Sequence, residues 1–177
     1  MLMPVSADSP TSASLALTFE DTSIEPSWFS VNDGVMGGLS QGGAEMKDGV
    51  LHFKGTLSLE NNGGFSSIRT RDFSVDLSSA KSITLRVLGD GRTYDLRLAT
   101  NARFRGSRIS YGAKFETKDG AWTEVSVPLT KLSPSWRGRQ LDGPPFDPSE
   151  VEEIGILLGD KKSGPFQLQI DWIKSAP

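Results

Sequence analysis

Two glycine-rich stretches carry most of the polar and aromatic side chains that could bind or react. The first reads WFSVNDGVMGGLS over residues 28–40, and the second reads NNGGFSSIR over residues 61–69. Glycine permits positive φ angles and close approach, while Asn and Asp hydrogen-bond their own backbone in turns. These stretches therefore predict either tight turns that close strands or the rim of a binding site.

The binding-rim interpretation assigns roles to specific residues. The glycines that would let a ligand or another backbone come close are Gly37, Gly38, Gly63 and Gly64. The side chains that would supply polar and aromatic contacts are Trp28, Asn32, Asp33, Asn62, Phe65 and Arg69. Under the alternative, the same residues are internal braces of two turns.

Arginines suggest a second contact surface. If alternate apolar residues over 83–87 and 94–98 face the core, Arg86 and Arg97 point away from it. Guanidinium groups bind carboxylates and phosphates through two parallel hydrogen bonds. One sheet face is therefore predicted to be basic, the alternative being solvated strands with cross-strand ion pairs.

Residues 133–148 contain four prolines and two glycines, which predicts a long ordered loop. Trp136 lies in this segment together with Arg137 and Arg139. The segment is either an aromatic and basic lid, or a loop that Trp136 anchors to the core.

The inventory of side chains argues against several chemistries. His52 is the only histidine, and there is no cysteine, so the chain lacks the ligands for zinc and has no thiolate. No G-x-S-x-G elbow or phosphate-binding glycine loop is present. We therefore expect no catalytic residues, although a pair of facing carboxylates could be recognised only in the folded chain.

Short apolar runs that alternate with polar residues predict an all-β protein. They lie over 15–19, 51–59, 83–87, 94–98, 109–115, 122–127, 154–158 and 166–172, with turn residues between them. Asp90-Gly91 predicts a hairpin between the third run and the fourth. The expected architecture is one antiparallel β-sandwich or jelly roll over 15–174, preceded by a disordered tail over 1–14.

The chain of 177 residues has a formal net charge of −3, which argues against binding nucleic acid or anionic membranes. The first residues lack the basic and apolar regions of a secretory signal, and no later run is long enough to span a membrane. From the sequence, a cytoplasmic location is expected.

An ordered set of motifs resembles the complex I intermediate-associated protein 30 family. The motifs are NDGVMGGLS over 32–40, FKG over 53–55, NGGFSSIR over 62–69, GPF over 164–166 and IDWI over 170–173. The resemblance implies a galactose-binding-domain-like β-sandwich without known catalytic residues, whose mitochondrial members help to assemble respiratory complex I. It favours a scaffold or chaperone whose partner is a protein, such as a subunit of a membrane complex.

Sandwiches of this kind that bind sugars suggest two further expectations. The first is carbohydrate binding on exposed aromatic rings, for which Trp28, Tyr94 and Trp136 are available. The second is a structural calcium site made by Glu20, Asp21 and Asp171, the alternative being solvated acids at strand ends.

Overall fold

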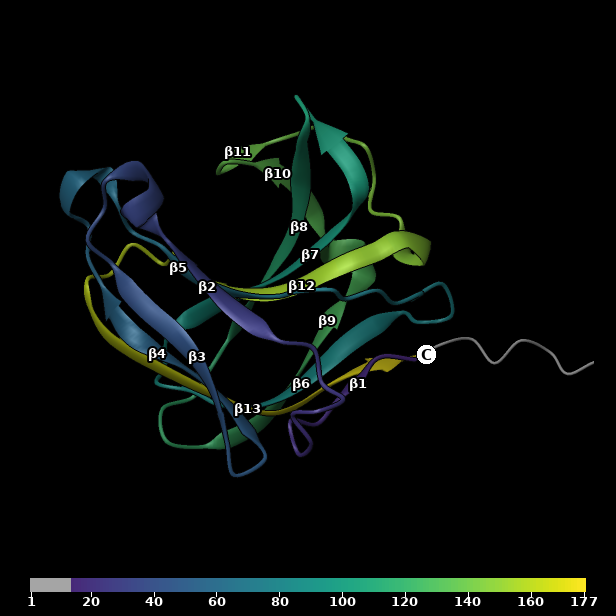
Figure 1. Ribbon diagram of the computed structural model, residues 1–177, viewed down its shortest axis with the longest axis horizontal. Helices are drawn as coiled ribbons and strands as arrows, with labels where there is room; N and C mark the ends of the chain where they lie inside the picture. Colours follow the sequence, from purple (N-terminus) through teal and green to yellow (C-terminus); the bar gives the residue numbers. More distant parts are fainter. Residues whose placement is uncertain (1–13) are drawn as a thin grey trace, which may run out of the picture.

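A computed structural model describes residues 14–177, and the tail predicted for residues 1–14 lies almost entirely outside this range. The described residues form two antiparallel sheets that pack face to face (Figure 1). This arrangement confirms the predicted all-β sandwich.

The six-stranded sheet has the order β3-β4-β13-β6-β9, and β1 also pairs with β13. Its strands are β1 (Ala16–Leu17), β3 (Gln41–Lys47), β4 (Val50–Leu57), β6 (Ser82–Leu88), β9 (Trp122–Pro128) and β13 (Gly164–Ala176).

The seven-stranded sheet has the order β11-β10-β8-β7-β12-β5-β2. Its strands are β2 (Trp28–Asn32), β5 (Ser66–Thr70), β7 (Thr93–Phe104), β8 (Ser107–Glu116), β10 (Ser133–Trp136), β11 (Arg139–Gln140) and β12 (Val151–Leu158).

Four short 3-10 turns complete the described chain, and none of its helices is long and apolar enough to cross a membrane. They are η1 (Asp33–Met36), η2 (Glu60–Asn62), η3 (Leu129–Lys131) and η4 (Pro148–Glu150).

The core lies between the sheets and follows the period-two pattern of the sequence. In β6, Leu85 and Val87 are fully buried, and in the opposite sheet Leu96 of β7 and Ile156 of β12 are fully buried as well. A strand turns successive side chains to opposite faces, so each run of alternating apolar residues supplies one inner face.

Two local predictions differ from the structure. Asp90-Gly91 does not close a hairpin, because β6 and β7 belong to different sheets and this segment crosses between them. The segment predicted as one loop over 133–148 contains the hairpin β10–β11 before its irregular part begins. β10 includes Pro134, which pairs in register with Tyr111 of β8.

Candidate functional site

The two glycine-rich stretches meet at one end of the sandwich. β2 pairs with β5, and the register places Asn32 opposite Ser66. η1 follows β2 and η2 lies just before β5, so the two 3-10 turns lie side by side at the upper left of Figure 1. The Asn61 side-chain amide donates to the Gly37 carbonyl at 3.2 Å and joins the two turns directly. We call residues 34–40 and 58–65 together the loop rim.

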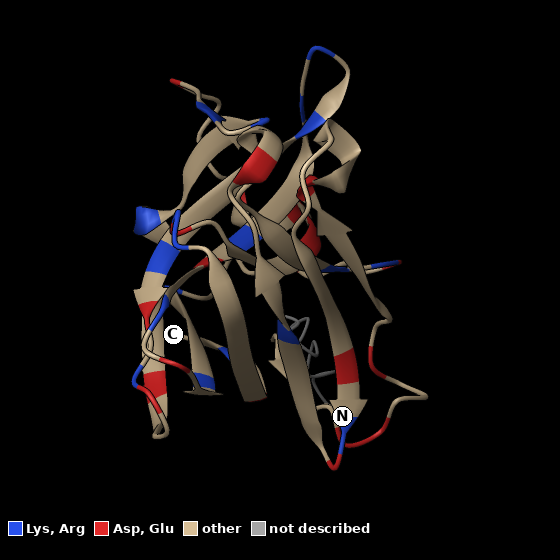
Figure 2. Cartoon of the chain, turned by 90° about the vertical axis from the view of Figure 1, so that its left-hand side faces the viewer, with Lys and Arg blue, Asp and Glu red and all other residues tan. Residues whose placement is uncertain are grey.

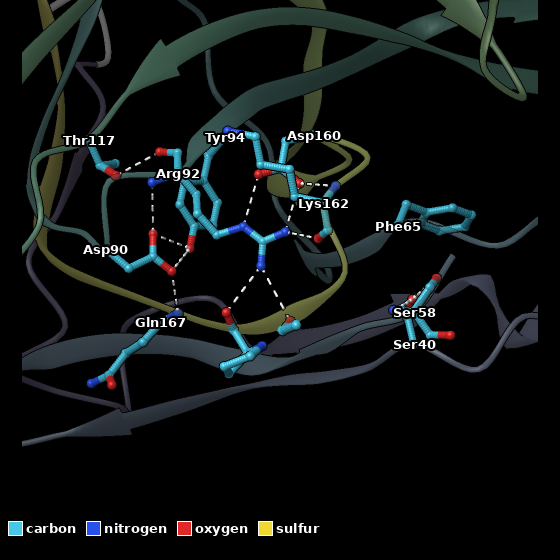
Figure 3. Close-up of polar contacts among 12 residues, drawn as sticks. Ser40, Ser58, Phe65, Asp90, Arg92, Tyr94, Thr117, Asp160, Lys162 and Gln167 are labelled. Atoms are coloured by element: carbon cyan, nitrogen blue, oxygen red, sulfur yellow. Dashed lines mark hydrogen bonds and ion pairs between the residues drawn. The ribbon is translucent and has the colours of Figure 1, made fainter. Parts of the chain in front are cut away.

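A buried carboxylate holds the loop rim together. Asp33 is completely inaccessible to solvent. Its carboxylate accepts hydrogen bonds from the Ser40 hydroxyl at 2.6 Å and the Ser40 backbone N–H at 2.9 Å. It also accepts from the backbone N–H groups of Gly64 at 2.6 Å and Phe65 at 3.3 Å. The single proton of the Ser40 hydroxyl goes to Asp33, and the hydroxyl oxygen accepts from the Ser58 N–H at 2.9 Å; the two serines lie at the right side of Figure 3.

The glycines make room for this carboxylate. A Cβ atom added to Gly38 would lie 2.4 Å from Cγ of Asp33, and one added to Gly63 would lie 2.5 Å from Oδ2 of Asp33. Real side chains do not approach so closely. The group that comes close to these two glycines is the Asp33 side chain, so the approach of a ligand or partner there stays a prediction.

Four hydrogen bonds to the charged form outweigh the cost of burying it. Burial raises the pKa of Asp33, but hydrogen bonds from Ser40, Gly64 and Phe65 hold this pKa below its ordinary value. Asp33 is thus a charged internal brace, which corrects the expectation that it supplies a partner contact.

Other predicted rim contacts also turn inward. The Asn32 amide donates to the Gly42 carbonyl at 3.1 Å and accepts from the Ser66 hydroxyl at 2.5 Å, so both of its polar atoms are used within the protein. Trp28 is half-buried and packs edge-on against Phe19, with ring centroids 6.2 Å apart. Asn32 and Trp28 therefore serve the internal packing of the joint between β2 and β5.

The remaining predicted contacts are more accessible. Asn62 is exposed, whereas Phe65 and Arg69 are half-buried. Arg69 lies on the outer face of the seven-stranded sheet, paired in register with Phe29 and Gly155. For these three residues a partner contact stays a prediction.

The loop rim exposes apolar side chains that the sequence interpretation missed. Val35, Met36, Leu39 and Leu59 are 76%, 63%, 53% and 42% exposed. Of the six large apolar side chains that are exposed in the described chain, only Ile24 and Trp122 lie elsewhere. The available signal was Val35-Met36 between two glycines, an apolar pair inside a stretch otherwise made of turn residues.

Arg86 and Arg97 do not share a surface. Arg86 belongs to β6 and Arg97 to β7, so they lie on the outer faces of opposite sheets. Arg86 pairs with Asp171 at 3.1 Å, and Arg97 pairs with Asp95 at 3.4 Å. Basic and acidic residues are interspersed over the strands and loops in Figure 2. The two arginines therefore do not form one basic sheet face. Arg86 makes a cross-strand ion pair from β6 to β13, as the alternative predicted, whereas Arg97 pairs with an acid of its own strand.

Two open grooves lie away from the loop rim. One, of about 500 Å³, is lined by Arg97 with Lys114 and Lys131. The other, of about 430 Å³, is lined by residues 100–102 and 144–148. Neither groove contains a residue of the glycine-rich stretches. The loop rim is thus an exposed surface outside these grooves.

The aromatic residues predicted as sugar platforms are mostly inside. Tyr94 is fully buried, and its hydroxyl donates to Asp90 at 3.0 Å. Trp136 is half-buried, with its ring centroid 5.2 Å from that of Phe104. Trp136 therefore contacts Phe104 of the neighbouring hairpin, and both interpretations of its segment, as a lid and as a loop anchored to the core, stay predictions.

The acids of the possible calcium site do not form one cluster. Asp171 is engaged by Arg86, and Asp21 accepts from Ser23 two residues later at 2.6 Å. Within residues 14–177 no three His, Cys, Asp or Glu side chains form a group that could hold a metal ion. Glu20 and Asp21 are exposed, as the alternative of solvated acids predicted, whereas Asp171 lies inside β13 and not at a strand end.

A buried ion pair that the sequence did not reveal joins the residue before β7 to the segment that follows β12 (Figure 3). Arg92 bonds both carboxylate oxygens of Asp160, at 2.9 and 2.7 Å, and the two side chains are 11% and 8% exposed. Its remaining N–H groups donate to the carbonyls of Lys162, Gly164 and Pro165. All five guanidinium donors of Arg92 are therefore engaged, and this residue belongs to the framework of the fold.

Comparison with known proteins gives two results. A model of the family described as complex I intermediate-associated protein 30 matches residues 17–170. "Complex I intermediate-associated protein 30, mitochondrial" of Mus musculus is 35% identical over 106 residues, which are 58% of this chain and 32% of the mouse protein. The protein of that name in Drosophila melanogaster is 26% identical over 72% of this chain and 44% of its own length. The matches span less than half the length of these relatives.

Among solved structures, a family 11 carbohydrate-binding module from Clostridium thermocellum, bound to a mixed-linked tetrasaccharide, resembles the chain with a TM-score of 0.63. It is 16% identical, and the match covers 93% of this chain and 96% of the module. An agarase matches with a TM-score of 0.59 and 14% identity, over 93% of this chain and 25% of the agarase. At such identities the likeness shows the fold alone.

Proposed function

Because the chain belongs to the complex I intermediate-associated protein 30 family, we propose that it is a non-catalytic module that binds a protein partner during assembly of a membrane complex. The relatives are named for their association with complex I intermediates, which favours a complex I subunit as the partner. The role is that of a scaffold or chaperone, which holds the partner without chemical change.

The observation that carries this proposal is the apolar surface of the loop rim. Val35, Met36, Leu39 and Leu59 are all exposed on two turns fixed to each other. Glu60 is the only ionisable residue on the rim, so little charge has to be desolvated when a partner covers it. Grouped apolar side chains on a surface mark interaction sites, and each contributes about 1.5–3 kcal/mol when fully buried.

The internal bracing supports the same conclusion. Hydrogen bonds from both turns converge on the buried Asp33 carboxylate, so the shape of the rim is set before a partner arrives. Preorganisation lowers the entropy lost on binding. A rigid apolar projection of this kind suits an apolar groove on an incompletely assembled subunit.

The test removes apolar surface without touching the brace. Val35→Ser, Met36→Ser and Leu39→Ser are combined, and Ile24→Ser is the matched control, because Ile24 is 80% exposed and lies outside the rim. Tagged forms are expressed in cells that assemble complex I, and co-purified complex I subunits are quantified by mass spectrometry. The original chain and the control should recover a subunit, and the triple variant should recover at least about tenfold less.

Equal recovery by the triple variant would place the contact elsewhere on the molecule. Failure of the original chain to recover any complex I subunit would reject the proposed role. Melting temperatures of all forms are measured alongside, since the proposal requires the triple variant to remain folded.

Carbohydrate binding is the second candidate, and the observation that favours it is Trp122. This indole is 37% exposed on the outer face of the six-stranded sheet, with Arg86 stacked on it at 4.8 Å. Sugar sites combine aromatic rings with planar hydrogen-bonding groups, and here Arg86, which is paired with Asp171, lies over the Trp122 ring. A glycan array on which the original chain binds and a Trp122→Ala variant does not would favour this candidate over the first.

A further inference from the structure

Two neighbouring hairpins of the seven-stranded sheet carry the same dipeptide at their tips. Arg105-Gly106 joins β7 to β8, and Arg137-Gly138 joins β10 to β11. The φ angles are +49° and +78° in the first turn and +47° and +78° in the second. Positive φ at both central residues is the geometry of the type I′ turn, which matches the twist of the strands. Each arginine is thus presented by a tight two-residue turn.

Aromatic rings hold the two tips together. The centroids of Phe104 and Trp136 are 5.2 Å apart, with the ring planes at 63°. The Arg105 guanidinium lies 5.5 Å from the Phe104 centroid and 5.7 Å from the Trp136 centroid. The Arg137 guanidinium lies 4.9 Å from the Trp136 centroid. We call Phe104, Arg105, Trp136, Arg137 and Arg139 the arginine tip; β10, β11 and the end of β7 lie together at the top of Figure 1.

The positive charge of the arginine tip is not neutralised within residues 14–177. Arg105, Arg137 and Arg139 are exposed, and none of the three forms an ion pair with a described acid. The adjacent glutamates of β12 are already engaged by Arg103 and Arg108. Three unpaired cations therefore gather on a molecule whose net charge is −3.

We propose that the arginine tip binds an acidic segment of a partner protein, rich in Asp and Glu. Stacking on a ring uses the flat face of a guanidinium and leaves its N–H edge free, and this edge bonds a carboxylate through two parallel hydrogen bonds. The guanidinium carbons of Arg105 and Arg137 lie over the rings of Phe104 and Trp136, 5.5 and 4.9 Å from their centroids. Nucleic acid fits less well, because the arginines already cover the rings on which bases would stack.

This inference rests on the proposed function and adds a second contact of different chemistry. The register places Leu158 of β12 beside Ser66, at the end of the sheet that carries the loop rim. At the other end of β12, Val151 pairs with Thr100, and β7 continues from there to the arginine tip. The apolar rim and the basic tip therefore occupy opposite ends of one sheet, where they can contact different parts of a partner.

The probe is a fluorescein-labelled poly-glutamate peptide, whose binding to the full chain is followed by fluorescence anisotropy at low salt. The tip variant combines Arg105→Gln, Arg137→Gln and Arg139→Gln. The charge-matched control combines Lys47→Gln, Arg71→Gln and Lys118→Gln, which are exposed cations elsewhere on the molecule. The tip variant should bind at least about tenfold more weakly than the original chain, and the control less than about twofold.

A third variant separates bidentate recognition from charge alone. Replacement of the three tip arginines by lysine keeps the charge but removes the paired N–H edges, and it should weaken binding about threefold or more. Equal loss in the tip variant and the charge-matched control would overturn the proposal, as would a lysine variant that binds like the original chain. Tighter binding to an oligothymidylate of equal charge, lost in the same tip variant, would reject an acidic protein segment as the ligand.

The loop-rim triple variant is included in the peptide assay to distinguish the two proposals. It should bind the peptide as the original chain does, since its substitutions lie at the opposite end of the sheet. If the peptide assay fails while the rim variant still loses the complex I subunit, the arginine tip is rejected and the proposed function stands. If only the subunit capture fails, the proposed function is rejected.

Discussion

Asp33 determines the shape of the candidate site, although it is hidden from any partner. One carboxylate joins residues that are 31 positions apart in the chain, from Asp33 to Gly64. Backbone N–H groups of both turns are satisfied by it, and buried donors without acceptors are costly. The positions of the exposed apolar residues of the loop rim therefore depend on the buried charge of Asp33.

Asp33→Asn should lower the free energy of unfolding by about 1–3 kcal/mol at pH 7. The amide presents a donor where the carboxylate accepts hydrogen bonds from Ser40, Gly64 and Phe65. Urea unfolding measures the effect, and Asp142→Asn is the control because Asp142 is exposed. A difference below about 0.5 kcal/mol between the two variants would contradict the bracing role.

The contribution of Asp33 to the free energy of unfolding should depend on pH. Its folded-state pKa is lowered, so its contribution to stability is fully present above the unfolded pKa of about 3.9 and is lost as pH falls through the folded pKa. The stability difference between the original chain and Asp33→Asn should therefore be constant near neutral pH and shrink below about pH 4. A difference that persists unchanged to the lowest measurable pH would oppose this assignment.

Gly38→Ala tests the close approach between the Asp33 carboxylate and the backbone at Gly38 by changing the glycine. The added Cβ would lie 2.4 Å from Cγ of Asp33, so the turn or the carboxylate must shift. Unfolding should require about 1–3 kcal/mol less free energy. Gly43→Ala is the matched control, because a Cβ there meets nothing within 4 Å, and it should change stability by less than about 0.5 kcal/mol.

At the scale of elements, the crossing from β6 to β7 is fixed by charged side chains. Asp90 accepts from the Tyr94 hydroxyl at 3.0 Å and from the Gln167 backbone at 2.8 Å. Arg92 bonds Asp160 and the carbonyls of the first two residues of β13, Gly164 and Pro165. Burial and the nearby charge of Asp90 raise the pKa of Tyr94, which keeps its hydroxyl protonated as a donor. The crossing is thus tied to strands of both sheets.

Arg92→Met should lower the free energy of unfolding by about 3–5 kcal/mol, because it leaves Asp160 buried without its cation. Thermal and urea unfolding provide the measurement. Arg71→Met is the comparison, since Arg71 is exposed and contacts Phe29 by stacking. A loss no larger than that of the comparison would show that the Arg92 network contributes little to the fold.

At the scale of the whole molecule, one apolar core is shared by both sheets. Its fully buried members include Leu51 and Ile170 from the six-stranded sheet, and Ile68 and Ile154 from the seven-stranded sheet. Neither sheet can lose its partner without exposing this core. The outer faces point in opposite directions, which keeps the groove at Arg97 away from the surface at Trp122.

We predict that the chain unfolds as one cooperative unit. Differential scanning calorimetry should show a single transition whose calorimetric and van't Hoff enthalpies agree, with an enthalpy of about 110 kcal/mol near 60 °C. Two separate transitions would show that the sheets or their loops are independent units, which would contradict a single domain over residues 15–174.

Much of the fold could be read from the sequence because a strand exposes its side chains with a fixed period. Leu51 and Phe53, like Leu96 and Leu98, alternate with polar neighbours, and all four are buried. Which strands would pair could not be read in this way. Asp90-Gly91 has the composition of a hairpin turn, yet β6 and β7 belong to different sheets, and Arg92 bonds Asp160 and the start of β13 at this crossing.

The sequence alone determined that the two glycine-rich stretches are special, because only glycine leaves room for another group so close to the backbone. Tertiary structure decided which group fills that room at Gly63, since Asp33 reaches this glycine across the pairing of β2 with β5, whereas Gly38 lies in the same turn as Asp33. The same pairing turned the polar side chains of Asn32 and Asp33 inward, where backbone partners were available. It left Val35 and Met36 outside, because their short turn offers no core to bury them.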